Sequence, residues 1–162
     1  MTRDPLKGHN ALRKGRVSLP WQIYNVTTAT VDRRPVFSDF DCACAASRCF
    51  ARTQLLGDAA MLAWVLMPDH VHWLIQLGER DSLDLVISRL KSASAREVNR
   101  LRASSGNLWQ RSFHDHALRR EEDLKTAARY IVGNPVRAGL AEHVGGYPYW
   151  NAIWLQERAL RA

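Results

Sequence analysis

The fold is decided by the stretch AMLAWVLMPDHVHWLIQL, residues 60–77, in which two apolar runs flank Pro68 and Asp69. Runs of this length, rich in branched and aromatic residues and separated by a short turn, are typical of a β-hairpin. Successive side chains of a strand point to opposite faces, so His70 and His72 should share one face. Two imidazoles side by side on a rigid strand form half of a metal site. An isolated pair of this kind, however, is more often two ordinary core or surface histidines.

The regions on both sides of the hairpin alternate between strand and helix patterns. Residues 21–31 and 108–118 predict strands, because they are rich in branched and aromatic residues. Helices are expected at 38–57, with Ser38 as N-cap and Gly57 at the end, and at 81–103, where apolar residues recur at helical spacing. A third helix is expected at 120–133, followed by a short helical stretch that Asn134 would cap.

This order, β-α-β-β-α-β followed by helices, predicts an α+β fold. The expected architecture is a ferredoxin-like antiparallel sheet with helices on one face, plus a C-terminal helical extension. Many functions occur on this fold, so the fold alone decides none of them.

Length and composition are those of one globular domain. The chain has 162 residues, of which 46% are hydrophobic and 24% are charged. We expect a basic N-terminal arm at 1–20 and a single domain at 21–162. No apolar stretch is long enough to span a membrane, and the N-terminus lacks the apolar region of a secretory signal. A cytoplasmic protein that does not contact membranes is therefore expected.

The charge points to an anionic partner. The formal net charge is +7 and the pI is about 9.8, which favours nucleic acid, although a basic chain can also simply be soluble. Cys42, Cys44 and Cys49 have no CxxC spacing and are interpreted as reduced residues in or near the core, without a function of their own.

Two further features could complete a site around the histidines. In ARYIVGNP, residues 128–135, Tyr130 and Asn134 lie one helical turn apart and could sit beside His70 and His72. Tyr130 could equally be a core-edge residue, and Asn134 only a cap. A rival pair, His114 and His116 in FHDH, also occupies alternate positions of an expected strand. By geometry alone that pair is equally able to bind a metal.

Four segments together resemble a known family. MPDHVHWLI, RLKSASAREVN, LWQRSFHDHALR and ARYIVGNPVRAGL, in this order, resemble the REP-associated tyrosine transposases, which have an IS200-like domain of the HUH class. The resemblance runs from about Trp21 to Trp154. It implies that His70 and His72 hold a divalent metal, Mg²⁺ or Mn²⁺, and that Asn134 completes the metal site. It also implies that Tyr130, on the C-terminal helical extension, is the nucleophile.

The resemblance implies a reaction on DNA. The substrate would be single-stranded DNA with a short hairpin, the repetitive extragenic palindrome (REP), cut through a 5′-phosphotyrosine intermediate that allows strand transfer. Tyrosine suits this role because a covalent intermediate conserves the energy of the phosphodiester. The family implies a monomer, with a dimer as the alternative. Two other functions are a catalytically silent hairpin-binding module and a metal-dependent hydrolase that uses water.

Basic and aromatic residues are candidates for DNA contact. Arginines bind backbone phosphates and carry affinity rather than sequence preference. His116, with Asp115, is interpreted as contacting DNA or supporting the metal ligands. Trp21, Trp109 and Tyr147 could stack on bases, although core packing is the alternative for the tryptophans. The basic candidates are Arg89, Arg96 and Arg100 on the second helix, Arg111, Arg119 and Arg120 near the proposed active helix, and Arg13, Lys14 and Arg16 on the arm.

Overall fold

The computed structural model describes residues 18–119 and 122–154, and five strands form its antiparallel sheet. The strand order is β4-β1-β3-β2-β5, in which the first four strands have the ferredoxin-like arrangement. The predicted α+β fold and the β-hairpin at residues 60–77 are therefore confirmed. The strands are β1 (Ile23–Ala29), β2 (Ala60–Leu66), β3 (His70–Gln76), β4 (His114–Ala117) and β5 (Trp150–Ala152).

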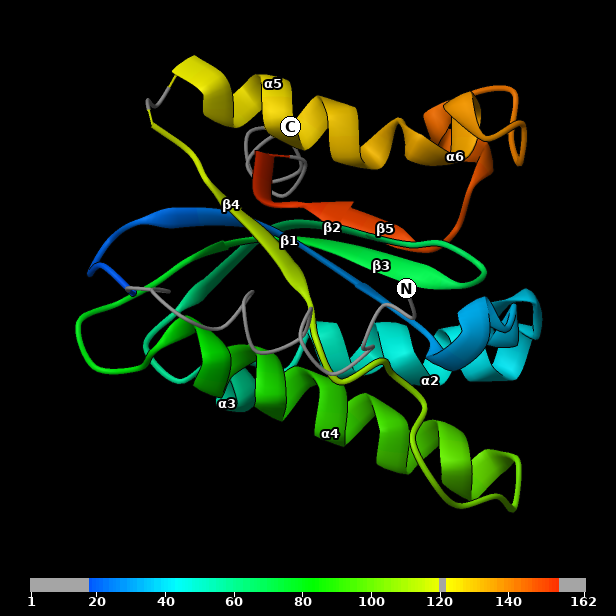
Figure 1. Ribbon diagram of the computed structural model, residues 1–162. Helices are drawn as coiled ribbons and strands as arrows, with labels where there is room; N and C mark the ends of the chain where they lie inside the picture. Colours follow the sequence, from blue (N-terminus) through cyan, green and yellow to red (C-terminus); the bar gives the residue numbers. More distant parts are fainter. Residues whose placement is uncertain (1–17, 120–121, 155–162) are drawn as a thin grey trace, which may run out of the picture.

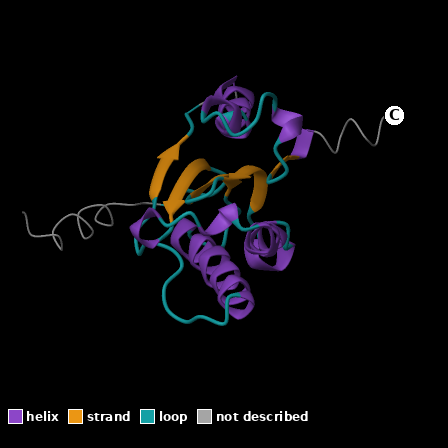
Figure 2. Cartoon of the chain, turned by 90° about the vertical axis from the view of Figure 1, so that its right-hand side faces the viewer, coloured by secondary structure: helices purple, strands orange, loops and turns teal. Residues whose placement is uncertain are grey.

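Helices cover both faces of this sheet (Figures 1 and 2). The two long helices of the β-α-β-β-α-β unit, α2 and α4, lie together on one face, as predicted. The C-terminal extension, α5 with α6, covers the other face. The helices are α2 (Phe40–Phe50), α3 (Thr53–Leu56), α4 (Leu83–Leu101), α5 (Glu122–Val132) and α6 (Asn134–Arg137), with 3-10 turns η1 (Val31–Arg33), η2 (Val36–Ser38) and η3 (Val144–Gly146).

Strand β5 was not expected from the sequence, which predicted only helices after residue 134. It has three residues and pairs with β2, where Val65 lies opposite Trp150. The backbone N–H of Leu66 also donates to the carbonyl of Tyr149 (2.9 Å). A strand this short has no alternation to detect, and only its contact with β2 defines it.

Two cap predictions were wrong, and one expected helix is divided in two. Asp39, not Ser38, caps α2, because its carboxylate accepts from the N–H of Cys42 (2.9 Å) while Ser38 belongs to η2. The expected helix at 38–57 divides into α2 and α3 at Arg52, whose extended backbone interrupts the helix. Asn134 is the first residue of α6 rather than its cap, which is Gly133.

Two hydrophobic clusters lie on opposite sides of the sheet. Trp73 and Val26 pack with Leu90 of α4 on one side, while Leu74 and Val65 pack with Ile131 of α5 on the other. Cys42 and Cys49 are buried, Cys44 is half-buried, and all three are unpaired, as expected. No helix within residues 18–119 and 122–154 is long and apolar enough to cross a membrane.

Candidate active site

The turn before His70 is held by bonds from two other segments. Its own closing bond runs from the N–H of Met67 to the carbonyl of His70 (2.8 Å). The carbonyl of Asp69 accepts from the N–H and the hydroxyl of Thr30, at 2.9 and 3.1 Å. The carbonyl of Pro68 accepts from the N–H of Phe37 (3.0 Å). These bonds fix the start of β3, and with it His70, against the end of β1.

His70 and His72 lie side by side on the sheet face that α5 covers. Their ring centroids are 4.9 Å apart and the ring planes are nearly perpendicular, at 88°. Leu74, two residues further on, packs in the same cluster as Ile131 of α5, so alternation places both histidines on that face. Both side chains are half-buried.

Each of the two rings has one nitrogen already engaged. Nδ1 of His70 lies 2.6 Å from Oδ1 of Asp69, and Nδ1 of His72 lies 2.8 Å from the hydroxyl of Thr27. A carboxylate can only accept, so Nδ1 of His70 carries a proton, and in the neutral ring Nε2 presents a lone pair. Histidines that bind metals are held in this way, by a partner on the nitrogen that faces away from the ion.

Asp69 is in turn supported by Arg33. Their side chains approach to 3.4 Å, and Arg33 and its neighbour Asp32 both have positive φ angles, 54° and 56°. Such backbone is costly outside glycine, and here it directs the arginine toward Asp69. Burial raises the pKa of Asp69, but the hydrogen bond from His70 and the charge of Arg33 lower it more, so the carboxyl stays ionised.

His72 is held neutral. Burial lowers its pKa from 6.5 to about 4, and the charges at His70, Arg137 and Arg33 add to this effect. A neutral imidazole is the form that binds a metal ion, so His72 can act as a ligand at neutral pH without first losing a proton.

The donor set fits a partly open divalent site. No group of three His, Cys, Asp or Glu residues is placed to hold a metal within the part of the chain that the structure describes. The remaining ligands would therefore be neutral oxygens, such as the amide of Asn134 or water, or the charged oxygen of a substrate phosphate. Mixed nitrogen and oxygen ligands with open positions are compatible with Mn²⁺ or Mg²⁺.

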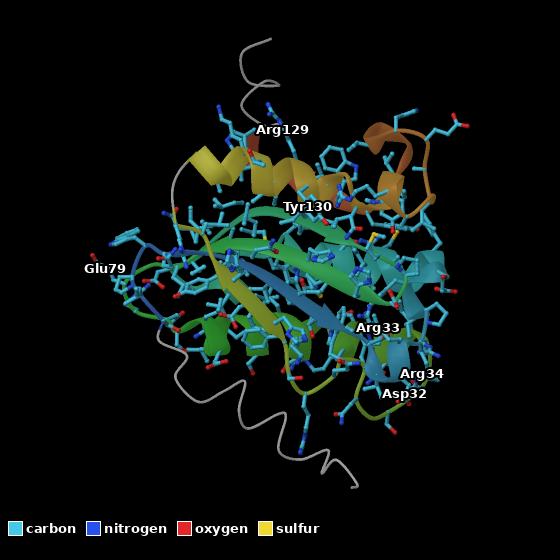
Figure 3. All side chains as sticks on the ribbon, turned by 45° about the horizontal axis from the view of Figure 1, so that its top comes forward. Asp32, Arg33, Arg34, Glu79, Arg129 and Tyr130 are labelled. Atoms are coloured by element: carbon cyan, nitrogen blue, oxygen red, sulfur yellow. The ribbon has the colours of Figure 1, made fainter. Side chains whose placement is uncertain are left out.

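Tyr130 lies on α5 and projects into solvent. Its side chain is 63% exposed, which is more than a core-edge packing role needs. α5 packs against β2, β3 and β5, and α6 lies above the end of the sheet where β3 begins (Figure 1). Figure 3 shows Tyr130 on this layer and Arg33 beyond the end of β1. Asn134, half-buried, opens α6 at the same end of the sheet.

The rival histidines occupy a different position. Strand β4 pairs with β1 so that His114 lies opposite Thr27 and His116 opposite Asn25. They share the sheet face of His72, but β1 separates the two pairs by about 10 Å, two strand spacings. Both are exposed. The structure therefore does not combine the two pairs into one site.

The predicted arginines do not gather around Tyr130. Arg89, Arg96 and Arg100 lie on α4, across the sheet from the histidine pair (Figure 1). Arg89 pairs with Asp81 and Arg100 with Glu97, while Arg96 is exposed. Arg111 borders a pocket lined mainly by α4, so its expected place beside the active helix is wrong. Arg119 is exposed just after β4, whereas Arg13, Lys14, Arg16 and Arg120 lie outside the described residues.

Of the three aromatic candidates, only Trp21 is accessible. It is 60% exposed and has a φ of 64°. Trp109 is buried and donates to the hydroxyl of Ser94 (2.9 Å), and Tyr147 is buried with its hydroxyl bonded to the carbonyl of Leu66. Burial also raises the pKa of Tyr147 to about 12. Trp109 and Tyr147 are core residues. The core-packing alternative is therefore confirmed for Trp109, and the suggestion that Tyr147 stacks on bases was wrong.

The sequence did not reveal three residues of this site: Thr27, Asp69 and Arg137. Asp69 directly precedes the histidine pair, and this adjacency was the one available signal. Thr27 meets His72 only through the register of β1 with β3, and Arg137 meets Tyr130 only through the junction of α5 and α6.

Comparisons with known proteins agree on one family. The model of the IS200-like transposase family matches residues 21–134. A candidate REP-associated tyrosine transposase of Haemophilus influenzae is 35% identical over 98 residues, which cover 54% of this chain and 56% of that protein. The REP-associated tyrosine transposase of Escherichia coli K12 is 32% identical over 87 residues, which cover 54% of this chain and 50% of that protein. The chain thus spans about half the length of the curated relatives it matches.

A solved structure has the same fold. It is that of a REP-associated tyrosine transposase bound to a REP hairpin, with a TM-score of 0.65 and 22% sequence identity. The match covers 83% of this chain and 79% of the other.

Proposed function

Because the chain belongs to the family of IS200-like transposases, we propose that it cuts and rejoins single-stranded DNA beside a REP-type hairpin, with Tyr130 as the nucleophile. Two findings support this substrate. A structural relative is bound to a REP hairpin, and the net charge of +7 favours a nucleic acid partner.

One observation carries the proposal. His70 and His72 have their Nδ1 atoms engaged and lie on the sheet face that α5 covers, and α5 carries an exposed tyrosine. A nucleophile for DNA has to be reached by a bulky substrate, which suits the 63% exposure of Tyr130. A tyrosine kept only for packing would not need to be so accessible.

The metal is part of the proposal. His70 and His72 would hold Mg²⁺ or Mn²⁺ through Nε2, and Asn134 would hold it through its amide oxygen. A divalent ion bound there would polarise a phosphoryl oxygen and offset the charge of the reacting phosphate. Asp69 and Thr27 would keep the two rings oriented toward the ion.

The reaction itself uses the phenol of Tyr130. Its oxygen attacks the scissile phosphorus and loses its proton, while the bond from phosphorus to the 3′ oxygen breaks and that oxygen takes up a proton. The products are a 5′-phosphotyrosine and a free 3′-hydroxyl. Attack by a 3′-hydroxyl on the same phosphorus reverses the step, so strands can be rejoined without an external energy source.

The experiment is a denaturing gel of wild type and Tyr130→Phe after incubation with labelled hairpin DNA and Mn²⁺. Wild type should give a covalent protein–DNA band only when the label lies 3′ to the cut. The variant, which keeps the ring and loses only the hydroxyl, should bind the hairpin but give neither band nor nick. Cleavage by the variant would indicate a hydrolase that uses water, and a wild type that cuts no hairpin would indicate a binding module.

A further inference from the structure

The junction between α5 and α6 brings Arg137 back onto Tyr130. α5 ends at Val132 and α6 begins at Asn134, with Gly133 between them in helical conformation (φ −79°, ψ −6°). The N–H of Arg137 donates to the carbonyl of Gly133 (3.2 Å), so the helical hydrogen-bond pattern includes the residue between the two helices. Seven residues, about two helical turns, therefore separate Tyr130 from Arg137 on nearly the same side.

The guanidinium of Arg137 contacts Tyr130 in two ways. Its central carbon lies 3.8 Å from the centroid of the tyrosine ring, within the range of a cation–π contact. Nη2 also donates to the backbone carbonyl of Tyr130, one of the carbonyls of the last turn of α5. One planar group thus holds both the ring and the backbone of the same residue.

Gly133 makes room for this contact. A Cβ at this position would lie 3.0 Å from Nη1 of Arg137 and 3.0 Å from the carbonyl oxygen of Arg129. Of these, the arginine is the end of a flexible side chain and would be the group that moves. Gly133→Ala should therefore displace the guanidinium of Arg137 from the ring, while the net charge of the protein stays the same.

An exposed tyrosine without such a contact would sample several rotamers. With 63% of its side chain exposed, Tyr130 has little packing to select one of them. Reaction rates depend steeply on how often a nucleophile is correctly placed. We propose that Arg137 is a positioning residue that holds the ring of Tyr130 in one orientation for attack on DNA, an inference that rests on Tyr130 being the nucleophile as proposed above.

The first test measures single-turnover formation of the covalent adduct and, separately, affinity for the hairpin. Arg137→Ala should slow adduct formation about 10- to 100-fold. The dissociation constant for the hairpin should stay within about threefold of the wild-type value.

Three further variants test the geometry of the contact. Arg137→Lys should not restore the rate, because an ammonium group is not planar and cannot stack on the ring while it also donates to the carbonyl of Tyr130. Gly133→Ala should slow the reaction in the same way. Arg129→Ala, the neighbouring arginine labelled in Figure 3, removes the same charge from α5 and should react like wild type.

The second test observes the ring without any reaction. The chain has four tyrosines, so protein labelled with 3-fluorotyrosine should give a simple fluorine NMR spectrum, in which Tyr130→Phe identifies one signal. Arg137→Ala and Gly133→Ala should move that signal toward the position of an unfolded tyrosine, and Arg129→Ala should not.

The outcomes separate the two proposals. A wild-type rate in Arg137→Ala, or a loss of affinity as large as the loss of rate, would overturn the positioning role and leave the nuclease intact. A signal that does not move would overturn it as well. If wild type forms no adduct with any hairpin, the proposed function fails and the positioning role falls with it, whatever the NMR spectrum shows.

Discussion

The two histidine pairs have the same spacing and share one face of the sheet, yet they differ in burial and in the partners of their rings. On β3, His70 and His72 are half-buried, and each has a partner on Nδ1. On β4, His114 and His116 are exposed at the edge of the sheet. The spacing of two imidazoles on a strand therefore provides the direction of the rings, whereas the neighbouring residues determine whether the rings are held by partners on Nδ1.

The largest difference should appear when one residue of each pair is removed. His72→Ala removes a ligand of the proposed metal and should abolish adduct formation at any Mn²⁺ concentration tested. His114→Ala should cut hairpin DNA at a rate close to that of wild type. Equal loss of activity in both variants would mean that the β4 pair also belongs to the metal site.

A smaller effect is expected from the partner of His70. Asp69→Asn keeps the size of the side chain but removes the charge that orients the ring. Such supporting residues typically change metal affinity by about 10- to 100-fold, so activity should be recovered at higher Mn²⁺. The measurement is a Mn²⁺ titration of the cleavage rate. If the variant depends on Mn²⁺ as wild type does, Asp69 has only a structural role in the turn before β3 and does not orient His70 for the metal.

The low pKa of His72 predicts a pH dependence of stability. The folded state binds the proton of His72 only near pH 4, and the unfolded state binds it near pH 6.5, so stability is lost as the pH falls between these values. The loss from this residue should reach about 3 kcal/mol at the acid end. Urea unfolding from pH 7 to 4.5 tests it, with His72→Gln as the control, which should show a shallower fall. Parallel curves would contradict the buried, neutral state of the ring.

The smallest effect is expected on β4. If His116 contacts DNA as the sequence suggested, His116→Ala should weaken hairpin affinity by less than about tenfold. The cleavage rate of bound DNA should not change. Fluorescence anisotropy at two salt concentrations measures the affinity, and an unchanged value would remove His116 from the interface.

The sequence predicted most of the fold because the relevant patterns are local. Two apolar runs and the turn residues between them identified the hairpin at residues 60–77, and helical spacing identified α4. Strand β5 was missed because it is defined only by pairing with β2. The division of α2 from α3 was missed because nothing in the residues around Arg52 is a strong helix breaker.

The candidate site was predicted only in part, for a similar reason. His70, His72, Tyr130 and Asn134 were found from motifs, and their roles stay predictions. The bond from Thr27 to His72 depends on strand register, which a single sequence does not specify. The grouping of arginines was wrong for Arg111, because its position next to α4 depends on how the loop after that helix returns to the sheet.

The two outer strands of the sheet have a consequence for how the protein behaves at high concentration. β4 has four residues and β5 has three, whereas each of the three inner strands has seven. A short outer strand presents few free backbone donors and acceptors to another chain, so sheets of neighbouring molecules have little to pair with. The strand order that places β3 and its histidines in the middle of the sheet thus also leaves only short edge strands, which limits aggregation through edge-to-edge pairing.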